Sequence, residues 1–164
     1  MADKSRRWLT ESLQKFLVPA FEERGFDVVP LTGEEASSRE FRRSFPFGYL
    51  RRVSSGGLDL VEIQLDKYDP KFRLNIGMAP VGGIDHAIGG HISQEDIRVH
   101  YLKRYFEAYS WPRFQRWFAI RRWFGPAATK VDYQNLVADN LGLVREVEGA
   151  LRDGRGRHIR VVEW

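Results

Sequence analysis

The sequence predicts an α+β domain in which an antiparallel sheet of about four to six strands is packed by an N-terminal helix and a C-terminal helix. Apolar residues recur at steps of three and four near both ends of the chain, whereas two central segments alternate between apolar and polar residues. The connection between these central segments is short enough for a hairpin. The length of 164 residues is typical of one domain, so we expect residues 1–164 to fold as a single unit.

The N-terminal helix is predicted by apolar residues at helical spacing from Leu9 to Phe21. Gly25 is placed to end it, because glycine adopts the left-handed conformation that commonly closes a helix. Residues 26–29 then predict a short strand, and residues 31–39 resemble a loop.

The centre of the chain predicts paired strands. Residues 41–52 carry aromatic side chains at odd positions, and Pro46 indicates an edge strand or a bulge because proline cannot donate a ladder hydrogen bond. Residues 58–65 and 71–78 alternate in polarity, so we expect them to pair through the turn at 67–70 as an antiparallel hairpin with one buried face.

The second half contains weaker patterns. Residues 97–101 predict a further strand, and Ser110 could cap a helix opened by Pro112. Residues 136–151 form an amphipathic pattern that Gly142 kinks or divides, and residues 158–164 predict a final strand.

Charge is distributed unevenly along the chain. The formal net charge is +4, but residues 98–124 hold seven basic residues and one acid, a local +6, which leaves −2 for the rest. The same segment holds ten of the 22 aromatic residues. This basic and aromatic segment is the most unusual feature of the sequence.

Several classes of protein are excluded. The absence of cysteine removes disulfides, thiolate metal sites and cysteine nucleophiles, and it favours a cytoplasmic protein. The start of the chain lacks the apolar core of a signal peptide, and the weakly polar run at 74–84 is too short to span a membrane. Phosphate-binding loops and the common hydrolase motifs are absent, so we expect no cofactor and favour a non-enzymatic protein.

Three histidines suggest a possible metal site. His86, His91 and His100 lie near Asp85 and Glu95, and imidazole and carboxylate groups bind zinc or manganese. However, their spacing matches neither a helix nor a strand. We therefore favour solvated histidines and predict no metal ligands.

A magnesium nuclease is the other catalytic hypothesis, based on Asp59, Glu62, Gln64 and Lys67. Glu62 and Gln64 share one face of the predicted strand. Asp59 points the opposite way and Lys67 has the wrong parity, so these groups do not converge without a bulge. A solvent-facing side of the hairpin is the favoured interpretation.

The basic and aromatic segment has two interpretations. Large aromatic rings supply core to a small domain, and arginine stems cover such rings while their charged ends stay in water. An exposed patch of the same composition is typical of a protein–protein interface. The residues predicted to bind a partner are Tyr105, Tyr109, Trp111, Arg113, Arg116, Trp117, Arg121 and Trp123.

The order of features in the first half resembles a known family. The segments that carry the resemblance are Gly25-Phe26, Phe41-Arg42, Val61-Glu62-Ile63-Gln64-Leu65 and Phe72-Arg73-Leu74-Asn75-Ile76-Gly77. They resemble the bacterial proteins grouped as domain of unknown function 4304. The resemblance implies a small cytoplasmic α+β protein, and an immunity-type binding role is one hypothesis that it suggests.

We therefore expect a non-enzymatic module that binds a protein partner through a basic aromatic surface. Single-stranded nucleic-acid binding is the first alternative, because arginines contact phosphates and aromatic rings stack on bases. A metal-dependent hydrolase that uses His86, His91 or Glu62 is the second.

Overall fold

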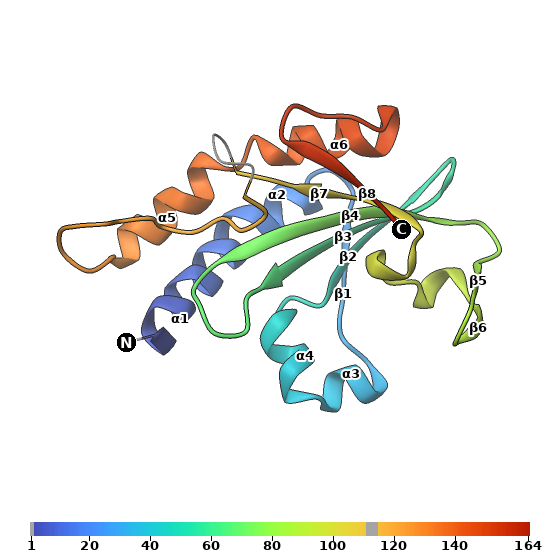
Figure 1. Cartoon of the computed structure of the whole chain (residues 1–164), viewed down its shortest axis with the longest axis horizontal. Helices are drawn as coiled ribbons and strands as arrows, with labels where there is room; N and C mark the ends of the chain where they lie inside the picture. Colours follow the sequence, from blue (N-terminus) through green and yellow to red (C-terminus); the bar gives the residue numbers. More distant parts are fainter. Residues whose placement is uncertain (1, 111–114) are drawn as a thin grey trace.

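The protein is described by a computed structural model of residues 2–110 and 115–164 (Figure 1). Its centre is an antiparallel sheet of six strands in the order β1-β2-β3-β4-β7-β8, and two further strands, β5 and β6, form a small separate sheet. The predicted α+β fold with an antiparallel sheet is confirmed. The strands are β1 (Asp27–Val29), β2 (Tyr49–Ser54), β3 (Gly57–Leu65), β4 (Phe72–Pro80), β5 (Ile84–His86), β6 (Gly90–Ile92), β7 (Arg104–Ala108) and β8 (Ile159–Glu163).

Helices lie on both sides of the central sheet, but unequally. The longer ones pack on one side, which we call the helix face, and two short ones lie on the opposite side, which we call the pocket face (Figure 1). The helix face carries α1 (Ala2–Ser12), a π-helical turn (Leu13–Leu17), α2 (Val18–Glu22), α5 (Lys130–Asp139) and α6 (Leu143–Asp153). The pocket face carries α3 (Gly33–Ser37), α4 (Arg39–Ser44) and the 3₁₀ turns Gln94–Asp96 and Val99–Tyr101.

The β3–β4 hairpin forms as predicted and separates apolar from polar side chains. Val61 pairs with Ile76, and Glu62 pairs with Asn75. Because alternate side chains of a strand point to opposite faces, Val61 and Ile76 join the main core under the helices while Glu62 and Asn75 face the other way.

Both terminal helical segments follow their sequence patterns. Gly25 adopts φ +86° in the turn that follows α2, so the predicted end of the N-terminal helix is confirmed. The C-terminal pattern is divided near Gly142 into α5 and α6, and Thr129 opens α5 by accepting a hydrogen bond from the Asp132 amide. Strand β8 lies within the predicted final strand.

Residues 33–37 and 39–44 form helices, whereas the sequence predicted a loop and the start of a strand. The side chain of Ser38 accepts a hydrogen bond from the Phe41 amide and caps α4. Phe41 and Phe45 stand four residues apart, which is also helical spacing, and their rings stack with centroids 6.2 Å apart. Their alternation in the sequence was therefore compatible with either period.

The prediction of a strand at 97–101 is wrong, because Val99–Tyr101 forms a 3₁₀ turn. The Val99 amide donates its hydrogen bond to the carboxylate of Glu62 at 3.0 Å, so a side chain replaces the ladder partner. The helix predicted after Ser110 falls partly on residues 111–114, which lie outside the described residues. Ser110 pairs with Gln115 in a β-bridge, and residues 115–124 form no helix.

No helix within residues 2–110 and 115–164 combines the length and the apolar character that a bilayer crossing requires.

Candidate functional site

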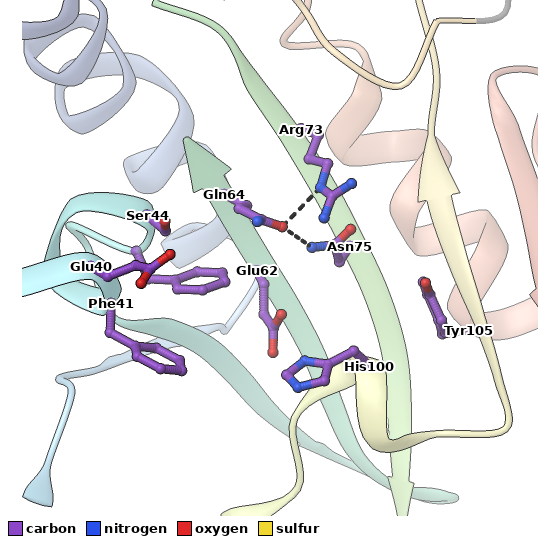
Figure 2. A pocket seen from close by; sticks show the side chains of 10 residues that line it. Glu40, Phe41, Ser44, Glu62, Gln64, Arg73, Asn75, His100 and Tyr105 are labelled. Atoms are coloured by element: carbon purple, nitrogen blue, oxygen red, sulfur yellow. Dashed lines mark hydrogen bonds between the residues drawn. The ribbon is translucent and has the colours of Figure 1, made fainter. Parts of the chain in front are cut away.

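The pocket face contains a cavity of about 320 Å³ between the β3–β4 hairpin and α4 (Figure 2). Strand β3 contributes Glu62 and Gln64, and β4 contributes Arg73 and Asn75. These side chains come together because Glu62 pairs with Asn75 and Gln64 pairs with Arg73 across the hairpin. The same alternation that builds the core thus places four polar groups on one surface.

The amide of Gln64 organises one end of the cavity. Its Oε1 atom accepts a hydrogen bond from Arg73 Nε at 2.8 Å and another from Asn75 Nδ2 at 3.0 Å, as Figure 2 shows. The guanidinium of Arg73 also lies over the ring of Trp117, 4.8 Å from its centroid. Burial lowers the pKa of Arg73, an effect that the nearby Glu107 carboxylate opposes.

The other end of the cavity is backed by a buried ion pair. Arg98 and Glu62 are each 3% exposed, and Arg98 Nε lies 3.2 Å from Glu62 Oε1. Arg98 also contacts Glu35 Oε1 at 2.5 Å, so one guanidinium joins two carboxylates. This pairing allows a carboxylate to persist in a site where an isolated charge would be strongly disfavoured.

Aromatic rings enclose the Arg98 guanidinium. Its central carbon lies 3.6 Å from the centroid of the Tyr49 ring and 5.1 Å from that of Phe45. The Tyr49 hydroxyl donates a hydrogen bond to Glu35 at 2.7 Å. Burial raises the pKa of Tyr49 well above its usual range, and this hydrogen bond is the second-largest cause in the same direction. The phenol therefore stays protonated.

His100 lines the cavity beside Glu62 (Figure 2). The residue as a whole is exposed, yet the partial burial of its imidazole lowers the pKa of the ring, and the Glu62 carboxylate acts in the opposite direction. At neutral pH the ring is therefore an uncharged group that can donate or accept a hydrogen bond.

The three histidines do not gather around a common point. His91 Nδ1 contacts Asp85 Oδ1 at 2.9 Å across the β5–β6 hairpin, while His86 packs against the ring of Tyr101. Among residues 2–110 and 115–164, no cluster of three or more His, Asp or Glu side chains is placed to hold a metal ion. Metal-dependent hydrolysis therefore has no support from the described side chains.

The proposed nuclease residues separate as their parity predicted. Asp59 points to the helix face, where Arg52 joins it at 2.8 Å and also contacts Glu148 on α6 at 2.5 Å. Lys67 lies in the β3–β4 turn and pairs with Glu40. Only Glu62 and Gln64 of the four residues meet in the cavity.

The residues predicted to bind a partner occupy different environments. Tyr105 on β7 lines the polar cavity, and Tyr109 donates a hydrogen bond from its hydroxyl to the Arg157 carbonyl. Trp117 is half-buried between Lys71 and Arg73. Trp111 and Arg113 lie outside the described residues.

Phe118 explains how this segment is anchored. It is 2% exposed, its ring stacks on Phe72 with centroids 5.1 Å apart, and the two backbones form a β-bridge. The chain then leaves the sheet, and Trp123 and Phe124 are 80% and 94% exposed. One part of the aromatic segment therefore belongs to the core and another part faces solvent.

Acids outside residues 98–124 pair with three of the basic residues of this segment, Arg98, Arg104 and Arg122. Arg116 pairs instead with Glu107, the one acid inside the segment. Arg116 shares Glu107 with Arg160 from β8, at 3.3 and 3.2 Å. The sequence could not reveal this pairing, because the partners lie on other strands and helices.

Sequence reasoning also missed Arg73 and Asn75 as members of a site. In the sequence they are simply the polar positions of an alternating strand, which normally face water. Their register opposite Gln64 and Glu62 was a usable signal, since pairing the two strands places all four on one face.

The chain matches no family model, no curated protein and no solved structure. The resemblance to the domain of unknown function 4304 proteins therefore stays a prediction.

Proposed function

We propose that the protein is a non-enzymatic binding module that holds a protein partner through residues 119–128, which we call the aromatic loop. The observation that carries this proposal is the exposure of two adjacent large aromatic side chains, Trp123 and Phe124. Soluble domains rarely leave such neighbouring apolar surface open to water, and buried tryptophan and arginine anchors dominate the energetics of many interfaces.

The shape of the aromatic loop supports the proposal. Trp123 and Phe124, together with Ile120 and the buried Tyr133 of α5, line a hollow of about 290 Å³. The loop is joined to the domain at both ends, by the Phe118–Phe72 bridge on one side and by the Thr129 cap on the other. Anchored ends reduce the conformational freedom that binding must remove.

Charge around the aromatic loop favours a protein over a nucleic acid. Arg122 pairs with Asp132, and Lys130 pairs with Glu11 on α1. Arg121 makes no ion pair with the described residues and donates instead to the Trp117 carbonyl. Nucleic-acid binding depends on several cations free to contact phosphates, whereas a protein interface needs few.

The test is affinity capture from the native host with the full chain and with the double variant Trp123→Ser/Phe124→Ser. We expect a stoichiometric protein that binds the wild type and is lost in the double variant. Tyr68→Ser is the matched control, because Tyr68 is also exposed, at 72%, but lies in the β3–β4 turn.

Two outcomes contradict the proposal. One is a partner retained equally by the double variant. The other is nucleic acid in place of protein, recognised by binding that weakens steeply with salt.

A further inference from the structure

The polar cavity holds an arginine whose hydrogen-bonding capacity is only partly used. Arg73 Nε donates to Gln64, which fixes the orientation of the guanidinium, and Trp117 covers one of its faces. The two terminal nitrogens make no hydrogen bond to any residue in the ranges 2–110 and 115–164. A guanidinium fixed in this way offers two parallel donors, the geometry that matches a carboxylate or phosphate.

The charge balance of this end also calls for an anion. Glu107 is the acid nearest to Arg73 on β7, but it already pairs with both Arg116 and Arg160. Arg116 and Arg160 therefore share one carboxylate, and Arg73 makes no ion pair with the described residues. A bound oxyanion would balance the remaining positive charge.

The opposite end of the cavity presents an acceptor. Glu62 Oε1 receives both Arg98 Nε and the Val99 amide, which fixes the carboxylate, while Oε2 makes no hydrogen bond to the described residues. The imidazole of His100 lies beside it (Figure 2). A ligand N–H group would complete the hydrogen bonding of Oε2.

The hairpin register places the two ends of the cavity on neighbouring strands. Glu62 and Gln64 are two residues apart on β3, and Arg73 stands opposite Gln64, so the backbone positions of Glu62 and Arg73 are offset by about 7 Å along the strands. Phe41 on α4 and Phe45 directly after it form an apolar wall of the same cavity. The aromatic wall between the polar ends suits a flat, partly apolar group.

We propose that this cavity binds a small planar molecule that carries an oxyanion at one end, held by Arg73, and an N–H donor at the other, held by Glu62. The volume of about 320 Å³ lies at the lower end of the range for small-molecule sites. The oxyanion can be a carboxylate, as in 4-aminobenzoate, or a phosphate, as in 4-aminophenyl phosphate. This site does not involve the aromatic loop, so its test is independent of the proposed protein partner.

The experiment is isothermal titration of the full chain with 4-aminobenzoate and with 4-aminophenyl phosphate. We expect at least one to bind with a Kd below about 1 mM. Tighter binding of the first compound identifies a carboxylate ligand, and tighter binding of the second identifies a phosphate ligand. For 4-aminobenzoate, benzoate and aniline are the matched compounds that each lack one end, and we expect both to bind more weakly.

The variants separate the site from general effects of charge. Arg73→Gln should weaken binding of the tighter compound by about tenfold or more, because it removes the charged donors. Arg73→Lys keeps the charge but not the paired donors and should also weaken it, which tests the geometry if the glutamine variant folds poorly. Arg152→Gln removes an exposed arginine on α6 and should bind as the wild type does.

Two results would overturn the proposal. The first is the absence of binding heat with either compound at millimolar concentration. The second is equal affinity in the wild type and in a folded Arg73 variant.

Discussion

The helix face and the pocket face of the sheet share strands β3 and β4 but differ in what they bury. On the helix face, Val61, Ile63 and Leu74 are at most 2% exposed and pack against apolar helices. On the pocket face, Glu62 and Asn75 are nearly as buried, at 3% and 7%, yet both are polar. Burial around the cavity is thus similar to that of the helix face, while its chemistry is opposite. Elsewhere on the pocket face, Leu60 and Ala79 join a second apolar cluster with Ile97, Val99 and Leu102.

This difference teaches which part of the hairpin serves stability and which part serves recognition. Apolar contacts are non-directional and tolerate many partners of suitable volume. The pocket face instead depends on specific pairs, such as Arg98 with Glu62 and Gln64 with Arg73, and each pair loses its value if one member is absent. Four predictions test the comparison, from the largest expected effect to the smallest.

Removing Arg98 should have the largest effect. Arg98→Met leaves Glu62 buried without its cation, and we expect the free energy of unfolding to fall by about 3–5 kcal/mol. Urea denaturation measures the change. The double variant Arg98→Met/Glu62→Gln should recover part of it, and a single variant as stable as the wild type would show that the pocket face does not depend on this pair.

On the helix face, a substitution that leaves a cavity in the core should lower the free energy of unfolding. Leu74→Ala removes a fully buried side chain beneath the helices and should cost about 3 kcal/mol, within the range for such deletions. Gln64→Ala, across the hairpin on the pocket face, removes two hydrogen bonds and should cost about 1–2 kcal/mol. Equal losses in the two variants would remove the proposed distinction between the faces.

Loosening the helix layer should leave the pocket face intact. Thr129→Ala deletes the cap of α5 and should lower the free energy of unfolding by about 1 kcal/mol. Because Thr129 contacts nothing in the cavity, ligand affinity should not change. A loss of affinity in this variant would show that the two faces are energetically coupled.

The smallest effect concerns pH. The pKa of His100 in the folded protein lies below its ordinary value of 6.5, so below that value the unfolded chain takes up a proton that the folded protein resists. The contribution of His100 to the free energy of unfolding is therefore fully present above about pH 6.5 and is lost as the pH falls below this value. Glu62 and Glu35 face the ring as acids, and Arg98 and Arg73 as cations.

His100→Gln should flatten the dependence of stability on pH below about pH 6.5, measured by denaturant midpoints at several pH values. The same slope in the His100 variant and the wild type would assign the pH dependence to other groups.

Much of the fold followed from local pattern. The alternation in β3 and β4 identified both strands, and Gly25 and Gly142 marked helix boundaries. Prediction failed where a side chain supplied what the backbone usually supplies, as when Glu62 accepted the Val99 amide in place of a strand partner. It also failed at Phe41 and Phe45, because a spacing of four fits both a strand and a helix.

The candidate sites were less predictable for the same reason. The parity of Glu62 and Gln64 was readable from the sequence and placed them together. Their partners Arg73 and Asn75 required the hairpin register, and Arg98 required a turn that no periodicity describes.

The sequence by itself determined the antiparallel hairpin, the helices at both ends and the concentration of charge and aromatic rings in residues 98–124. Only the tertiary structure decided how that segment is used, with Phe118 in the core and Trp123 in solvent. It also decided that acids outside the segment pair with Arg98, Arg104 and Arg122. The physical reason is that periodicity acts over a few residues, whereas charge pairing and exposure depend on contacts between residues far apart in the chain.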